Sequence, residues 1–122
     1  MIEFALVIGV FLWMFFGIID GGRFVWAYNT VAFACREGTR YAIVRGAANV
    51  SPATSAQITT IVQNRAAGLD PLLITVTSTW LPDNKAGSYV QVKVAYTFKP
   101  VTPVFTLASY QVTSTSKMAI SQ

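Results

Sequence analysis

The chain begins with a run of sixteen residues without a charged side chain, positions 4–19, bounded by Glu3 and Asp20. A helix that spans a bilayer needs about 20 mostly apolar residues, with a range of about 17–25. Met1 and Ile2, on the far side of Glu3, bring the segment to the lower edge of that range. A carboxylate in hydrocarbon is costly and is usually kept for a function. The run therefore predicts a helix that lies in a membrane or in the apolar core of an assembly.

Two other structures compete with this interpretation. A secretory signal peptide has a basic first region and a small-residue cleavage site, and neither motif accompanies this run. A core helix of a soluble fold must bury its apolar side chains, but the aromatic side chains here point in several directions around one helix. A chain of 122 residues is too short to cover them all. They are Phe11, Trp13, Phe15 and Phe16.

The composition argues against catalysis. Only 11% of the residues are charged, against about 25% in a soluble domain, and the shortfall lies mainly in the first twenty residues. The chain has no histidine, which removes the commonest general base and metal ligand. No Ser-x-x-Lys pattern with supporting residues and no phosphate-binding loop is present. The net charge of +4 comes without a basic run, so we expect no nucleic-acid partner. Because the residues and motifs named above are missing, we also expect no enzyme activity, no cofactor and no metal.

The single cysteine, Cys35, cannot form an intrachain disulfide. We expect a small buried residue on a helix face, with an intermolecular disulfide as the less favoured alternative.

Glycines mark the end of the apolar run. Gly17 and Gly21 have the spacing that lets two helices approach closely, and Gly22 follows. Because each glycine weakens a helix by about 1 kcal/mol relative to alanine, the segment is either a close-contact point or a place where the helix bends or melts. Asp20 and Arg23, three residues apart, can pair weakly at an exposed site.

The remainder of the chain predicts a small domain packed on the second half of a long helix. The helix covers residues 2–45, about 65 Å at about 1.5 Å per residue, with Arg36, Glu37 and Arg40 on its solvated face and Gly46 beyond its end. Ser51 and Pro52 predict the start of a second, short helix, which ends at Gly68 and Asp70-Pro71. The predicted buried stripe of the long helix is Phe24, Tyr28, Val31, Cys35, Gly38 and Ala42, and that of the short helix is Ile58, Ile61, Val62, Ala66 and Leu69.

Alternating apolar residues predict strands at 72–80, 89–98 and 110–121, with a turn-rich connection at 81–88 and a break at Pro100 and Pro103. A three-stranded sheet with one apolar face needs a cover. The expected fold is α+β and pilin-like: a long N-terminal hydrophobic helix, a short second helix and a three-stranded antiparallel sheet packed on the C-terminal half of the long helix. We divide the chain into a hydrophobic segment at 1–22 and a globular domain at 23–122.

Three motifs carry a resemblance to a known family: Glu3-Phe4-Ala5-Leu6-Val7, Gly17-Ile18-Ile19-Asp20-Gly21-Gly22-Arg23 and Ala34-Cys35-Arg36-Glu37-Gly38-Thr39-Arg40-Tyr41-Ala42. Together they resemble the TadE-like family, pilin-like proteins of the tight-adherence (Tad) pilus systems related to type IV pilins. The resemblance is strongest up to Ala42. It implies cleavage by a prepilin peptidase after a glycine, with the acid fifth in the mature chain. The acid is third here, so we expect the mature N-terminus to be displaced by about two residues.

The resemblance further implies that Glu3 pairs with the N-terminal amine of a neighbouring subunit, whereas the residues alone equally allow Glu3 at the lipid headgroups. It also places the residues after the apolar run outside the cell, although the arginines that follow the run favour the cytoplasmic side. The expected partners are copies of the chain, the inner membrane, the prepilin peptidase and the pilus assembly machinery. The expected assembly residues are Met1, Glu3, Phe4, Gly17, Gly21 and Gly22.

The function predicted from these features is a structural pilin that leaves the inner membrane and polymerises into an extracellular adhesive pilus on a prokaryotic cell. A minor pseudopilin that primes or tips the filament is one alternative. A single-pass membrane protein with a ligand-binding outer domain is another, of a different class. Asn49-Val50-Ser51 also fits a glycosylation acceptor.

Overall fold

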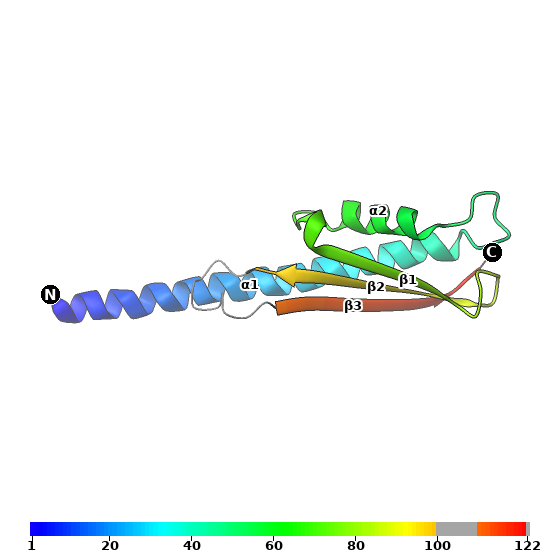
Figure 1. Ribbon diagram of the computed structural model, residues 1–122. Coiled ribbons are helices and arrows are strands. Elements are labelled where there is room, and N and C mark those ends of the chain that lie inside the picture. Colours follow the sequence, from blue (N-terminus) through cyan, green and yellow to red (C-terminus); the bar gives the residue numbers. More distant parts are fainter. Residues whose placement is uncertain (100–109, 122) are drawn as a thin grey trace.

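The computed structural model describes residues 1–99 and 110–121. It contains a long helix α1 (Ile2–Ile43), a short helix α2 (Ser55–Arg65), a 3₁₀ turn η1 (Pro71–Leu73) and three strands, β1 (Ile74–Leu81), β2 (Tyr89–Phe98) and β3 (Tyr110–Ala119). The sheet and α2 lie beside the C-terminal half of α1, while the N-terminal half extends away from them (Figure 1). The predicted α+β architecture is confirmed. The predicted break at Pro100 and Pro103 lies outside the described residues.

The half of α1 beside the domain buries small side chains. The predicted stripe is right from Val31 onward and wrong at Phe24 and Tyr28, which are 39% and 51% exposed. The sheet packs closely on α1, so alanine, glycine and cysteine occupy most of the contact. Phe24 lies instead at the end of the sheet, where its ring packs edge-on against Phe98 with 5.5 Å between centroids. The buried residues in this half are Ala27, Val31, Ala34, Cys35, Gly38, Thr39 and Ala42.

The second helix begins later than its sequence signal predicted. Ser51 and Pro52 precede it, and Thr54 is the N-cap. The Thr54 hydroxyl accepts from the backbone N–H of Gln57, while the Gln57 side chain accepts from the N–H of Thr54. This capping box satisfies two backbone donors at the start of α2, the N–H groups of Thr54 and Gln57.

The end of α2 also differs from the prediction. The last helical residue is Arg65, and Gly68 lies in the following turn with φ +82°. A Cβ at Gly68 would lie 2.6 Å from the ring of Trp26, so the turn packs directly on α1. Asp70 caps η1 by accepting from the N–H of Leu72 at 3.0 Å, and β1 therefore starts at Ile74 rather than at residue 72.

The sheet has the order β1-β2-β3, with both pairs antiparallel. The predicted bounds of β2 are confirmed, and its even-numbered residues from Val90 to Phe98 are all buried against the helices. On the opposite face, threonines of β1 and β3 flank Lys93 of the central strand. The third strand ends at Ala119, and Ser121 then donates from its backbone N–H to the carbonyl of Ile43 at 3.0 Å. This contact ties the end of the sheet to the end of α1.

The two helices approach each other at Gly38. A Cβ at this position would lie 2.6 Å from Cγ2 of Val62. Only glycine allows Val62 to pack on the α1 backbone at this distance, so Gly38 fixes the spacing of α1 and α2.

Candidate functional site: the exposed half of the long helix

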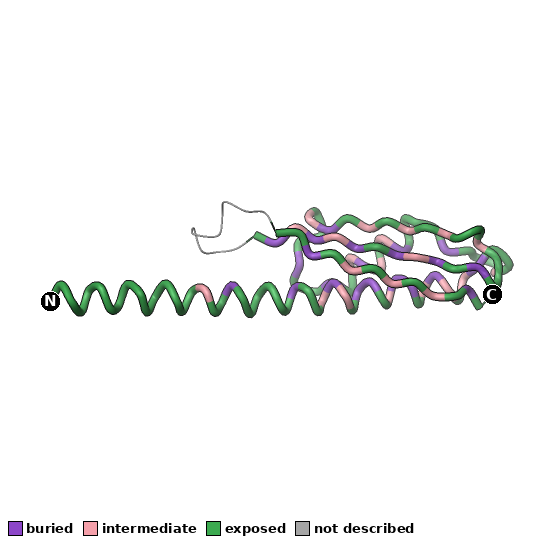
Figure 2. Tube along the Cα trace, turned by 90° about the horizontal axis from the view of Figure 1, so that it is seen from below, coloured by how far each residue is buried: buried purple, intermediate pink, exposed green. Residues whose placement is uncertain are grey.

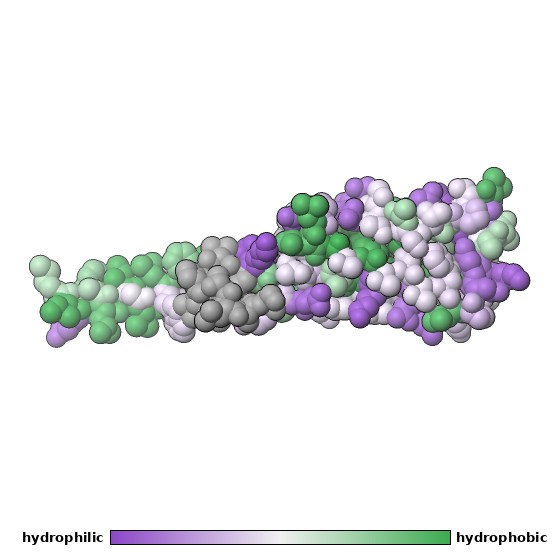
Figure 3. All heavy atoms as spheres, in the orientation of Figure 1, coloured by the Kyte–Doolittle hydropathy of each residue, from purple (hydrophilic) through white to green (hydrophobic). Residues whose placement is uncertain are grey.

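The N-terminal half of α1 contacts almost nothing in the described chain. Every residue of 1–16 is exposed, and Figure 2 shows this half as a bare helix beside a partly buried domain. The space-filling view shows hydrophobic side chains concentrated along it (Figure 3). Among the residues described, α1 is the one helix with a stretch long and apolar enough to cross a membrane, and no residue of that stretch is buried. A monomer in water rarely exposes so large an apolar surface, so this segment requires lipid or protein around it.

The first turn carries Met1, Glu3 and Phe4, three of the predicted assembly residues. Met1 is the N-cap and offers no side-chain cap. Glu3 lies in the first turn, where a carboxylate is favoured by the partial positive charge of the helix N-terminus. In the described part of the chain, Glu3 forms no hydrogen bond or ion pair, and Phe4 is 71% exposed. The first turn is therefore open to a partner.

The glycines at the end of the apolar run do not interrupt the helix, because α1 is α-helical from Ile2 to Ile43. Nothing lies within 4 Å of a Cβ built on Gly17, Gly21 or Gly22. The prediction of a bend or melted segment is thus wrong. The close-contact role stays a prediction, since these glycines have no described neighbour within one chain.

The apolar run ends at a buried acid, which corrects the prediction of an exposed Asp20–Arg23 pair. Asp20 is 6% exposed, and its carboxylate lies 3.6 Å from the Arg23 guanidinium. Arg23 in turn lies over the ring of Phe98, 5.6 Å from the centroid. The pair and this ring contact hold the end of β2 against α1 where the helix leaves the domain.

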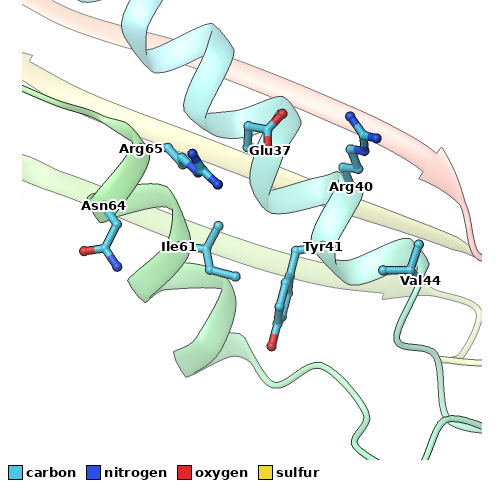
Figure 4. A pocket seen from close by; sticks show the side chains of 7 residues that line it. All are labelled: Glu37, Arg40, Tyr41, Val44, Ile61, Asn64 and Arg65. Atoms are coloured by element: carbon cyan, nitrogen blue, oxygen red, sulfur yellow. The ribbon is translucent and has the colours of Figure 1, made fainter.

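A groove of about 480 Å³ separates α2 from the end of α1. The groove is lined by Glu37, Arg40 and Tyr41 of α1, by Val44 just beyond the end of α1, and by Ile61, Asn64 and Arg65 of α2 (Figure 4). The side chains of Tyr41 and Ile61 lie between the two helices (Figure 4). Glu37 and Arg40 were predicted on a solvated face, and the structure shows Arg40 exposed and Glu37 half-buried.

Cys35 is fully buried and free, in agreement with the prediction of a small buried residue. Its thiol donates to the carbonyl of Val92 at 3.1 Å. Burial raises the pKa of the Cys35 thiol above its ordinary value of 9.0, so the thiol stays protonated at neutral pH. An intermolecular disulfide at Cys35 would require the core to open.

Asn49 has a structural role in the connection that follows α1. Its Nδ2 donates to the carbonyl of Val44 at 3.1 Å, and its Oδ1 accepts from the N–H of Ser51 at 3.0 Å. The side chain thus shapes the turn. Glycosylation at Asn49 stays a prediction.

The comparison with protein families agrees with the resemblance drawn from the sequence. The family model described as TadE-like protein matches residues 1–40, which cover the exposed half of α1 and most of its buried half. No curated protein and no solved structure matches the chain.

Proposed function

We propose that this chain is a structural subunit of an extracellular filament of the Tad pilus type, and that it polymerises through the apolar half of α1. The TadE-like match over residues 1–40 supports a pilus-related role. The observation that carries the proposal is that residues 1–16 are all exposed and that none of the apolar stretch long enough to cross a membrane is buried. A structural role also suits a chain without histidine, and we propose no catalytic activity.

The physical basis is that one apolar helix can occupy two environments in turn. In the inner membrane its side chains face lipid, and in a filament they face the same segment of other copies. Because both surroundings are apolar, transfer between them changes the hydrophobic free energy little, and close packing then decides in favour of the polymer. Gly17, Gly21 and Gly22 offer places of close approach, since nothing in the described chain fills the space beside them.

The division of the surface into an apolar helix and a polar sheet face suits a filament. The exposed apolar helix is the part to be buried, whereas the sheet presents threonine and lysine side chains on its outer face. We propose that this face lies on the outside of the pilus, at a prokaryotic cell surface, after the subunit has left the inner membrane. Adhesion through this exterior and processing by a prepilin peptidase belong to the same proposal.

Fractionation of cells tests the proposal. Cells are sheared, and the released fibres and the inner membranes are quantified by mass spectrometry for this chain. A major subunit makes up most of the protein in the fibres. Trace amounts in the fibres indicate the minor pseudopilin that primes or tips the filament. Recovery only from the inner membrane contradicts a filament role and favours a membrane-anchored module, for which the open groove between α1 and α2 is the candidate binding surface.

A further inference from the structure

We propose that Arg36 and Arg40 of one copy receive the Glu3 carboxylate of another copy. The inference rests on the proposed function, because it requires copies to pack through α1. It gives Glu3 a partner, the two exposed arginines at the domain end of the helix. The family resemblance implies a different partner, the N-terminal amine of a neighbouring subunit.

The apolar surface of α1 does not stop at the end of the candidate span. Val25 and Phe33 lie beside the domain and are still 57% and 50% exposed. They share one side of the helix, opposite the residues that pack on the sheet. We name this side the open face, and its members recur at steps of three or four residues, the spacing of one helix face: Gly22, Val25, Asn29, Phe33, Arg36 and Arg40, all exposed.

The open face continues the exposed apolar half without interruption and ends in positive charge. It carries no carboxylate. Within residues 1–99 and 110–121, neither Arg36 nor Arg40 forms an ion pair. A second helix that covers the open face would bury both guanidinium groups, which is costly without an acid. The occupant must therefore bring a carboxylate to this end of α1.

Glu3 is the acid best placed to do so. Asp83 is engaged by Ser88 and Lys85, and Asp70 caps η1. Asp20 lies against Arg23. Glu37 lines the groove beside α2, as Arg40 does, but it lies off the open face and forms no ion pair with either arginine in the described residues. Glu3 alone lies on the bare part of α1, on the surface that an assembly covers, and it has no partner among the described residues. Lys93 and Lys117 are poor alternatives as receptors, because both lie on the outer face of the sheet.

The length of the helix sets the offset between the two copies. Arg36 follows Glu3 by about 50 Å along α1, at about 1.5 Å per residue. The pairing thus joins parallel helices staggered by about that distance. Other copies lie between these two at smaller offsets, and they contact their neighbours through the apolar segments. Two arginines can hold one carboxylate with several charge-assisted hydrogen bonds, which would fix the stagger where apolar packing alone permits sliding.

Charge exchange tests the pairing. Sheared filament mass, relative to the amount of chain in the membrane, is measured for Glu3→Arg, for Arg36→Glu with Arg40→Glu, and for the combination of all three. We expect each parent variant to lose at least about tenfold in filament mass, because removing one partner of a buried pair is strongly unfavourable, and the combination to regain most of it. Pairing of Glu3 with an amine alone predicts no recovery. The inference is overturned if the combination gives no more filament mass than Glu3→Arg alone. It is also overturned if the variant with Arg36→Glu and Arg40→Glu assembles normally.

Two controls keep the outcome specific. Lys93→Glu with Lys117→Glu makes the same charge change on the outer face of the sheet, and we expect it neither to block assembly nor to rescue Glu3→Arg. In otherwise native filaments, Ile2→Cys with Phe33→Cys should give oxidative cross-links between copies, because Phe33 lies on the open face one turn before Arg36, whereas Ile2→Cys with Lys93→Cys should not. Equal cross-linking of both pairs, or none for the first, overturns the inference. Wild-type filaments accompanied by a failed exchange leave the proposed function intact, whereas absence of wild-type filaments removes its basis.

Discussion

At the scale of single residues, the glycines of α1 fall into two groups with different physical roles. Gly38 is buried against Val62 of α2 within one chain, whereas Gly17, Gly21 and Gly22 have open space around them. A Cβ is therefore excluded at Gly38 by the fold of the subunit itself. At the other three positions, only a contact between copies can make a side chain costly.

Replacing Gly38 by alanine should destabilise the subunit. The added Cβ meets Val62 at 2.6 Å, and overpacking of this kind costs about 1–3 kcal/mol. The measurement is thermal unfolding of the detergent-solubilised full chain. Gly21→Ala is the matched control and should leave stability unchanged or raise it by up to about 1 kcal/mol through helix propensity. Equal stability of the Gly38 variant and the wild type would show that α1 and α2 are not held at this distance.

Replacing Glu3 by alanine should leave a stable membrane protein that assembles poorly. Glu3 has no described partner within its own chain, so the fold does not depend on it. In a filament its loss leaves the partner charge buried and unpaired, which is costly. The chain should accumulate in the inner membrane at the wild-type level while sheared fibres decrease strongly. A normal yield of filaments would contradict a role for Glu3 in contacts between copies.

At the scale of elements, the start of α2 depends on its capping box. Thr54→Ala removes the hydroxyl that accepts from Gln57 and should destabilise the subunit by about 1 kcal/mol. Ser51→Ala is the control, because Ser51 precedes the helix and contributes only its backbone N–H to Asn49. Chemical denaturation of both variants in detergent checks the difference. A larger loss for Ser51→Ala would place the true helix start at the Ser-Pro sequence.

The exposed half of α1 should tolerate a large side chain in the monomer but not in the assembly. Gly17→Leu adds a side chain where one chain has nothing within 4 Å, and leucine favours a helix over glycine. Insertion and stability should therefore be retained, while filament formation should fall because the helices can no longer approach closely. The yield of sheared fibres measures this effect. Unaffected assembly would mean that Gly17 lies away from the contacts between copies.

The elements differ in how well the sequence predicted them, for identifiable reasons. The bounds of β2 follow from its unbroken alternation, because one face of that strand is buried along its whole length. The predicted start of α2 was wrong because Ser51-Pro52 resembles a helix start, whereas the capping box that the structure shows is at Thr54. Phe24 and Tyr28 were assigned to the core by their size and period. The close approach of the sheet favours small residues in that contact.

The candidate assembly site was only partly predictable. The exposure of Glu3 and of the apolar residues up to Phe16 follows directly from an apolar helix too large for the domain to cover. The open face was not predictable, since it depends on which side of α1 the sheet occupies. Arg36 and Arg40 therefore looked like ordinary solvated residues until the position of the sheet defined a continuous surface on the opposite side.

At the scale of the whole molecule, the fold separates two functions along one helix. The C-terminal half of α1 is the support on which α2 and the sheet pack, and the N-terminal half is a bare apolar rod. The domain is complete without the rod, because its core lies between the sheet, α2 and residues of α1 from Ala27 onward. Folding of one chain thus does not explain the exposure of the rod, whereas the proposed assembly would supply the apolar surroundings that it needs.

The central claim is that the apolar half of α1 forms the core of a polymer. Cryo-electron microscopy of sheared filaments, at a resolution that shows side chains, tests it most directly. We expect parallel copies of residues 2–22 packed around the filament axis, with the sheets outside and their threonine-rich faces in solvent. Filaments that contain this chain with the α1 segment outside the core, or fibres built without this chain, would contradict it.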